Sequence, residues 1–78
     1  MQGMLPTTKQ VRLTGRRVMS LTLEREFWGA LERIAFVRSV GLDRLIQDIH
    51  AQRKRIAPHL SLASAARVYA LHNRVRLN

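Results

Sequence analysis

Hydrophobic and polar residues alternate over a short stretch near the N-terminus, and this period of two predicts one half-buried strand over residues 17–23. The apolar side of this strand consists of Met19, Leu21 and Leu23. The opposite side carries three small side chains, Val18, Ser20 and Thr22. A lone strand leaves backbone N–H and C=O groups unpaired, so we expect it to pair antiparallel with the same strand of a second copy across a two-fold axis.

Apolar residues recur at helical spacing after this strand. A first helix is predicted over residues 24–38, with an apolar stripe formed by Phe27, Ala30, Leu31, Ile34 and Ala35. Trp28 lies beside this stripe, and we interpret it as a core or interface residue rather than a platform for a ligand. The strand and this helix follow each other without a gap.

Two further helices are predicted. The second spans residues 42–56, with Gly41 as a tolerable N-cap and Pro58 beyond its end. Its inward residues are Leu45, Ile46 and Ile49. The third spans residues 61–73, with Ser61 as its N-cap, and it is apolar over two adjacent faces. The expected fold class is therefore mainly α, with one strand, two core helices and a third, C-terminal helix.

Residues 1–15 follow neither period, and Pro6, two threonines and Gly15 favour a flexible basic arm there. The alternation of Val11 and Leu13 with Arg12 leaves room for a short strand. We expect the chain to divide into this arm, a strand-helix-helix domain over residues 16–57, and a C-terminal helix with its tail over residues 58–78.

The length and composition limit how such a chain is stabilised. A core built from 78 residues rarely supplies more than roughly 3–5 kcal/mol. Cysteine is absent, which excludes disulfides and a zinc site built on thiolates. Self-association is the remaining route, so we expect an obligate oligomer. The dimer core would consist of Met19, Leu21, Leu23, Phe27, Trp28, Leu31, Ile34, Leu45, Ile46 and Ile49.

The charge is distributed unevenly along a chain whose net charge is +9. Residues 1–17 carry four basic residues and no acid, and residues 51–78 carry six basic residues and no acid. The middle of the chain is nearly balanced. Two strongly basic ends favour a polyanionic partner, and nucleic acid is the first candidate.

Other functional classes find little support in the sequence. His50, His59 and His72 are scattered without an acid at ligand spacing, so we expect no metal and no other cofactor. No pairing of a nucleophile with a base and no glycine-rich phosphate loop occurs, so we expect no enzyme activity. No apolar run approaches the ~18 residues of a membrane span, and no stretch resembles a signal peptide, so we expect a cytoplasmic protein without a membrane partner.

A two-stranded ribbon fits the ~12 Å major groove of DNA, and short side chains let its backbone approach the base edges. We expect Val18, Ser20 and Thr22 to contact bases, together with Arg16 and Arg17 at the start of the strand. The N-terminus of the second helix, at Gly41, Leu42 and Asp43, would offer main-chain N–H groups to a phosphate. The acid at residue 43 would have to turn aside.

Basic residues outside the strand are the other candidates for phosphate contacts. They are Lys9, Arg12, Arg53, Lys54 and Arg55. The run at residues 53–55 is equally consistent with a solvated helix end, which would place no DNA there. The arm would wrap the duplex, or it would stay free of it.

The stretch from Arg17 to Glu24 and the following Glu-Phe-Trp-x-Ala-Leu, residues 26–31, resemble the ribbon-helix-helix family of Arc/MetJ-like DNA-binding repressors. The turn at residues 39–41 reads Ser-Val-Gly, where the family has a Gly-Leu-Ser-like turn. Leu45, Ile46 and Ile49, with residues 64–68 (Ser-Ala-Ala-Arg-Val), are similar to a stand-alone subgroup that has an added C-terminal helix. The resemblance implies an intertwined homodimer that often assembles further on neighbouring half-sites.

The leading hypothesis is a homodimeric, sequence-specific regulator of transcription, in the form of a repressor that binds double-stranded DNA. One alternative is an antitoxin-like interaction module, in which the C-terminal helix covers a protein partner and DNA binding is secondary. Another is an architectural protein that binds DNA without sequence preference.

Overall fold

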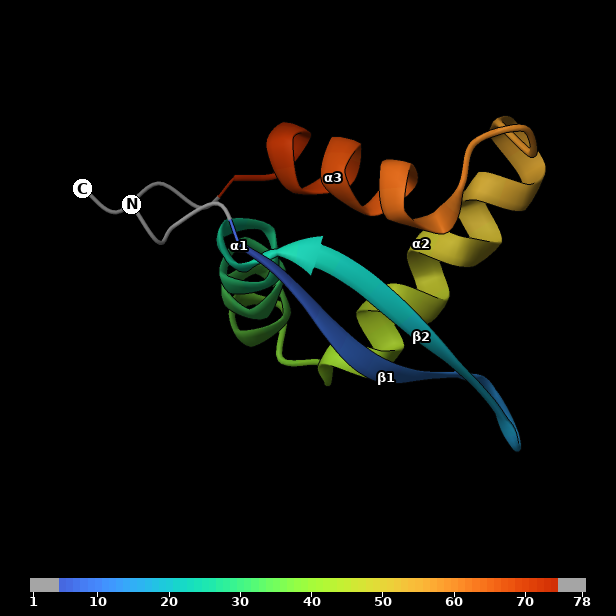
Figure 1. Cartoon of the computed structure of the whole chain (residues 1–78), viewed down its shortest axis with the longest axis horizontal. Coiled ribbons are helices and arrows are strands. Elements are labelled where there is room, and N and C mark those ends of the chain that lie inside the picture. The colour runs from blue at the N-terminus through green and yellow to red at the C-terminus, as the bar shows by residue number, and fades with distance from the viewer. Residues whose placement is uncertain (1–4, 75–78) are drawn as a thin grey trace.

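A computed structural model describes residues 5–74 of the chain. Two strands, β1 (Pro6–Thr14) and β2 (Arg17–Glu24), are followed by three helices. The helices are α1 (Arg25–Val37), α2 (Leu42–Ile56) and α3 (Leu62–His72), as Figure 1 shows. The expected ribbon-helix-helix class with an added C-terminal helix is thereby confirmed. The first four residues of the expected arm and the last four of the expected tail lie outside the described residues.

The ribbon itself corrects two expectations. Residues 6–14, expected to form a flexible arm, form a nine-residue strand. β1 pairs antiparallel with β2, so one edge of β2 has its partner in the same chain, where the sequence analysis expected only the same strand of a second copy. The register sets Val11 opposite Met19 and Lys9 opposite Leu21. The backbone groups along one edge of β2 are therefore paired within one chain.

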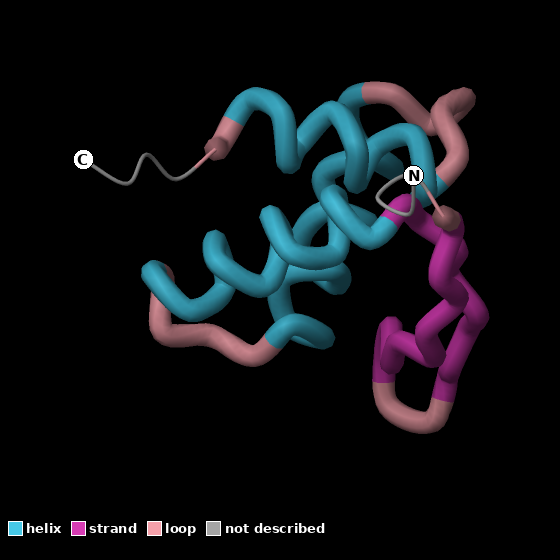
Figure 2. The backbone as a smooth tube through the Cα atoms, turned by 60° about the vertical axis from the view of Figure 1, so that its left-hand side comes forward, coloured by secondary structure: helices cyan, strands magenta, loops and turns pink. Residues whose placement is uncertain are grey.

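A two-residue connection, Gly15 and Arg16, joins the strands. Gly15 has a φ of +47°, a backbone conformation that residues with a side chain rarely adopt. Glycine at the first of two loop positions is what a type II′ hairpin turn favours. The register is irregular between Arg12 and Thr14, just before this turn. The tip of the hairpin projects beyond the helices in both views (Figures 1 and 2).

The helices cover one face of the hairpin, and Figure 2 shows the strands on one side of the helical part. α2 packs on β1 and on α3, and α3 also packs on α1 and β2. Eight of the ten residues expected in a dimer core are buried within this single chain, and Met19 and Phe27 pack against them half-buried. The core also contains residues that the sequence analysis did not assign to it, namely Val11, Leu13, Leu62, Ala66 and Ala70.

Specific polar contacts fix the ends of these elements. Trp28 donates its indole N–H to the Thr7 carbonyl at 2.8 Å and so ties α1 to β1. The N-cap Ser61 accepts a hydrogen bond from the amide of Ser64 at 3.0 Å, as expected from the sequence. Arg67 of α3 donates to both carboxylate oxygens of Glu24, at 2.9 and 3.3 Å, where β2 passes into α1.

We predict that Val11→Ala lowers the free energy of unfolding by about 2 kcal/mol, because the side chain is 2% exposed and its loss leaves a cavity under β1. Val18→Ala makes the same change on the exposed side of β2 and should cost less than about 0.5 kcal/mol. Denaturant titration of both variants measures the difference. Equal, small effects would show that β1 is not part of the folded core.

The hydrogen bonds from Arg67 lower the pKa of Glu24 below its usual value of 4.5. The unfolded chain therefore binds a proton at a higher pH than the folded chain does, and stability falls as pH falls through this range. We predict that Glu24→Gln is less stable than the unaltered protein at about pH 6, and that this difference shrinks toward about pH 3. Thermal unfolding across this range measures it, and a difference independent of pH would contradict the assignment.

Candidate nucleic-acid interface

The side of the hairpin turned away from the helices forms an exposed and mostly polar surface, here called the outer face. Three cross-strand pairs build it, in which residues 8, 10 and 12 of β1 face residues 22, 20 and 18 of β2. Its members are exposed and comprise Thr8, Gln10, Arg12, Val18, Ser20 and Thr22. The strand period places them there because the alternate residues enter the core.

Hydrogen bonds across the strands order the outer face. The hydroxyls of Thr8 and Thr22 lie 2.6 Å apart. Gln10 donates its side-chain amide to the Ser20 hydroxyl at 2.9 Å. A two-stranded surface with hydroxyl and amide groups can approach the edges of bases in a groove about 12 Å wide. The expected base-contacting residues of β2 therefore lie together on one exposed surface.

Basic residues surround the tip of this surface. Arg16 occupies the connection between the strands, and Arg17 is the first residue of β2; both are exposed. The guanidinium of Arg12 donates to the Gly15 carbonyl at 3.1 Å, which holds it near the turn. The outer face contains no carboxylate. Its electrostatic character suits an anionic ligand.

The N-terminus of α2 lies beside β1. The Arg12 amide donates to the Asp43 carboxylate at 3.3 Å, and the Gln47 side chain donates to the Arg12 carbonyl at 2.9 Å. The Asp43 carboxylate is thus turned toward the strand. Gly41 caps the helix without a side-chain hydrogen bond, and a Cβ atom there would meet nothing within 4 Å. The first turn of α2 is therefore open to an anion next to the hairpin edge.

Lys9, expected to contact phosphate, lies on the inner side of β1. Its ammonium group is 3.0 Å from the Glu32 carboxylate and 5.4 Å from the centre of the Trp28 ring. An anion would have to compete with both groups for this charge. The geometry does not bring Lys9 together with the outer face.

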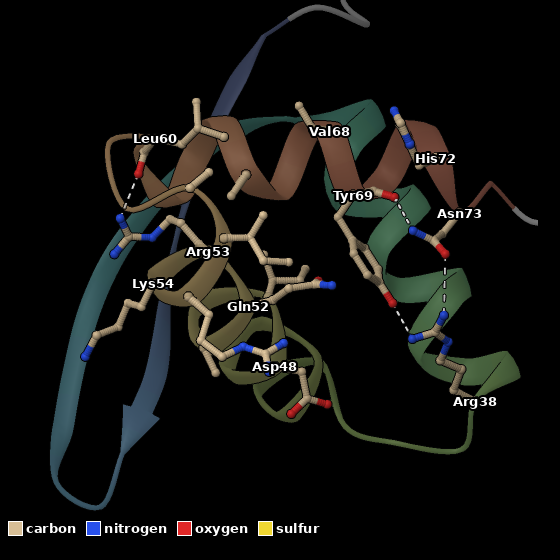
Figure 3. A pocket seen from close by; sticks show the side chains of 16 residues that line it. Arg38, Asp48, Gln52, Arg53, Lys54, Leu60, Val68, Tyr69, His72 and Asn73 are labelled. Atoms are coloured by element: carbon tan, nitrogen blue, oxygen red, sulfur yellow. Dashed lines mark hydrogen bonds between the residues drawn. The ribbon is translucent and has the colours of Figure 1, made fainter.

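The basic run at residues 53–55 lines an open groove of about 990 Å³ between α2 and α3, shown in Figure 3. Arg53 donates to the carbonyls of Leu60 at 2.7 Å and of Pro58 at 3.4 Å, so its guanidinium holds the loop between the two helices. Lys54 and Arg55 are exposed. Among the described residues, none from either strand lines this groove.

His50 adjoins the same loop, and its Nδ1 atom lies 3.2 Å from the Arg53 guanidinium. Burial lowers the pKa of His50, and the positive charges of Arg53, Lys54 and Arg17 lower it further. The imidazole is therefore poised to accept a hydrogen bond from Arg53 in its neutral form. The contacts of Arg53 and His50 therefore connect α2 to the loop that precedes α3.

The sequence analysis did not identify Thr8 and Gln10 as residues of the outer face. It placed Arg12 in a flexible arm and not in a strand. The signal was present: Val11 and Leu13 alternate with polar residues, and two residues beginning with glycine separate them from the next strand. Thr7 and Lys9 obscured it, because these inward positions are polar.

Within the described part of the chain, no group of three or more histidines, cysteines or acidic residues could hold a metal ion. None of the described helices has the length and apolar character required to cross a membrane.

Comparison with known proteins identifies the family. The family model described as "Ribbon-helix-helix domain" matches residues 6–73, which include both strands and all three helices. No curated protein and no solved structure matches the chain. Because the match covers most of the chain and follows the same order of elements, the protein belongs to the ribbon-helix-helix domain family of DNA-binding proteins.

Proposed function

We propose that this protein is a sequence-specific regulator of transcription, acting as a repressor, that places its hairpin in the major groove of double-stranded DNA. The observation that supports this most is the outer face: an exposed, hydrogen-bonded two-stranded surface with arginines at its tip. Base contacts by this face would supply the sequence preference, and phosphate contacts would supply most of the affinity.

Phosphate contacts are proposed at two places beside the ribbon. Arg16 and Arg17 are exposed at the hairpin tip and would reach a guanine in the groove or the phosphate beside it. The main-chain N–H groups of Gly41, Leu42 and Asp43 would bind a phosphate at the N-terminus of α2, where the helix dipole favours negative charge. Lys54 and Arg55 are exposed, but they line the groove between α2 and α3 and lie outside the hairpin. They would therefore attract the duplex at long range without binding a phosphate beside the ribbon.

We further propose that two copies bind together as a homodimer on an inverted repeat, with further dimers on adjacent sites. The support is the family membership together with the small core of a 78-residue chain. A two-fold symmetric protein requires a two-fold symmetric site, so the two half-sites would be inverted copies of one sequence.

A protein partner on α3 is the second candidate. Val68 and Leu71 on this helix are 47% and 56% exposed, and their spacing of three residues places them on one side of the helix, where they offer a small apolar surface to a partner. An antitoxin-like protein would cover this surface with its toxin. Co-purification from the source cell distinguishes the two: a stoichiometric protein partner supports the interaction module, and its absence supports the regulator.

We predict that affinity selection of fragmented DNA from the source genome enriches an inverted repeat, and that binding to this site weakens steeply with salt. Each neutralised phosphate contributes about −0.9 to the slope of log K against log salt concentration. Titrations at several salt concentrations measure this slope. A slope near zero would contradict phosphate binding, and uniform recovery of all fragments would indicate an architectural protein.

We predict that Ser20→Ala and Thr22→Ala each lower the preference for the selected site over an altered site by about 1 kcal/mol, because each removes a hydroxyl from the outer face. Ser64→Ala on α3 makes the same change away from the hairpin and should leave the preference unchanged. Competition binding measures all three. If neither hairpin variant alters the preference, β2 does not read the sequence.

A further inference from the structure

The open groove between α2 and α3 has two walls, and each wall contains one face of a helix. On both helices, lining residues recur three, four and seven positions apart, which is the spacing of a single helix face. These residues are Ala65, Val68, Tyr69 and His72 on α3, and Ile49, Gln52 and Ile56 on α2. The groove therefore follows about two turns of each helix.

The walls leave apolar surface uncovered. Ile56 is 68% exposed and Val68 is 47% exposed. Leu62, Ala66 and Ala70, on the neighbouring face of α3, are buried in the core. This arrangement accounts for the two adjacent apolar faces that the sequence predicts for the third helix. The core of one chain uses one of these faces, and the other lies open in the groove.

The charges around the groove are mostly positive. The basic residues that line it are Arg38, Arg53, Lys54 and Arg55. Asp48 is the one acidic residue among the described residues of the lining, and its carboxylate lies 3.3 Å from the guanidinium of Arg44. The groove therefore combines an apolar surface with an excess of positive charge, which favours a partner that is both apolar and acidic.

Positive charge lies at both ends of the groove. Lys54 and Arg55 belong to the last turn of α2, next to the loop that leads into α3. At the other end, Arg38 donates to the Tyr69 hydroxyl and, at 3.5 Å, to the side-chain carbonyl of Asn73. Figure 3 shows Lys54 and Arg38 on opposite sides of the groove. The part of α3 between these ends is about 12 Å long, so the charges flank an apolar stretch of about two helical turns.

A helix fits this groove better than an extended segment or a nucleic acid does. An extended segment would place unpaired N–H and C=O groups against two helices whose own backbone groups are already bonded. A phosphate backbone would lose water against the apolar side chains of Ile56 and Val68. A helix satisfies its own backbone and can place one row of side chains between the two walls.

A second copy of this chain does not supply an acidic helix. The chain has five acidic residues. Four of them already hold contacts within the chain, namely Glu24, Glu32, Asp43 and Asp48. Glu26 alone is left to oppose the basic groove, and a second copy would bring a further net charge of +9. Charge complementarity therefore favours a different protein in the groove.

We propose that the groove between α2 and α3 binds an acidic amphipathic helix of another protein. Its apolar side chains would pack on Ile56 and Val68, and its carboxylates would lie near Arg38, Lys54 and Arg55. This goes beyond the proposed function, because it gives a DNA-binding regulator a second binding surface. Such a helix can bind reversibly, so a regulator that purifies without a stoichiometric partner is compatible with it.

The probe for this site is a stapled helical peptide of about 15 residues, with leucine along one face and glutamate on the flanking positions. The matched control peptide carries lysine in place of every glutamate. NMR follows the amide signals of the isotope-labelled full chain as each peptide is added. The acidic peptide should shift the signals of Ala65, Val68 and Tyr69, and it should bind at least about tenfold more tightly than the lysine peptide. Unchanged groove signals, or equal binding of the two peptides, would overturn the inference.

Substitutions in the groove test the same contact from the side of the protein. Val68→Glu removes an apolar contact and adds a repelling charge, so it should weaken binding of the acidic peptide by at least about tenfold. Val68→Gln removes the apolar contact alone and should weaken it less. Leu71→Glu is the matched control, because it makes the same change at an exposed apolar residue of α3 that does not line this groove. If Val68→Glu and Leu71→Glu weaken the peptide equally, the attraction is general to the basic surface and the inference fails.

The same NMR signals identify other occupants. Shifts of the groove signals on raising the concentration of the chain alone would assign the groove to a second copy. Shifts on adding a DNA duplex that displaces the peptide would assign it to nucleic acid, and either result would overturn the inference.

The proposed function and this inference can fail separately. Among the described residues, none from either strand lines the groove, so Val68→Glu should leave the preference among DNA sites unchanged. A chain that binds the acidic peptide in the groove but shows no preference among DNA sites would contradict the regulator alone. A chain that prefers its DNA site but does not bind the peptide would contradict this inference alone. The residue at position 68 is 47% exposed, so its variants should unfold at nearly the same denaturant concentration as the unaltered protein.

Discussion

The pairing of β1 with β2 within one chain is the interaction on which the rest of the structure depends. It satisfies one backbone edge of β2 and places Val11 and Leu13 over the helices. It also brings the Arg12 backbone to the first turns of α2, where Asp43 and Gln47 bind it. Core, outer face and the open helix N-terminus are therefore linked through a single hairpin.

The same pairing explains how a short chain without cysteine closes its core. The inward apolar residues of both strands and of all three helices form one cluster. Arg67 and Glu24 connect α3 to the end of β2. Leu62, Ala66 and Ala70 of α3 also lie in the core, so the added helix covers the core mainly through apolar packing. The case for a dimer therefore rests on family membership and on the small size of this core.

The sequence predicted the helices and β2 well, because their apolar residues recur at unambiguous spacing. α2 has the expected bounds, and the other elements begin and end within about a residue of theirs. β1 escaped prediction because two of its inward positions, Thr7 and Lys9, carry polar side chains, which interrupt the alternation. Lys9 is accommodated because its ammonium group lies over the Trp28 ring and beside Glu32. Only half of the outer face could therefore be assigned from the sequence.

Charged residues were harder to assign than apolar ones, since their roles depend on neighbours distant in the chain. Lys9 is paired with Glu32, and Arg53 is bound to the carbonyls of a loop, although both carry the charge expected of a phosphate contact. Asp43, which would repel a phosphate, is turned toward the Arg12 amide. Net charge indicates the class of ligand, and these contacts decide which charges remain available to it.

The most direct test of this account is an isotope-filtered NMR experiment on an equal mixture of labelled and unlabelled chains, which detects only contacts between different chains. We expect proton contacts between Val11 and Met19, and between Lys9 and Leu21, in the uniformly labelled protein and none of them in the filtered spectrum of the mixture. Cross-strand contacts that persist in the filtered spectrum would show that the two strands of the ribbon come from two chains, and would contradict the central claim.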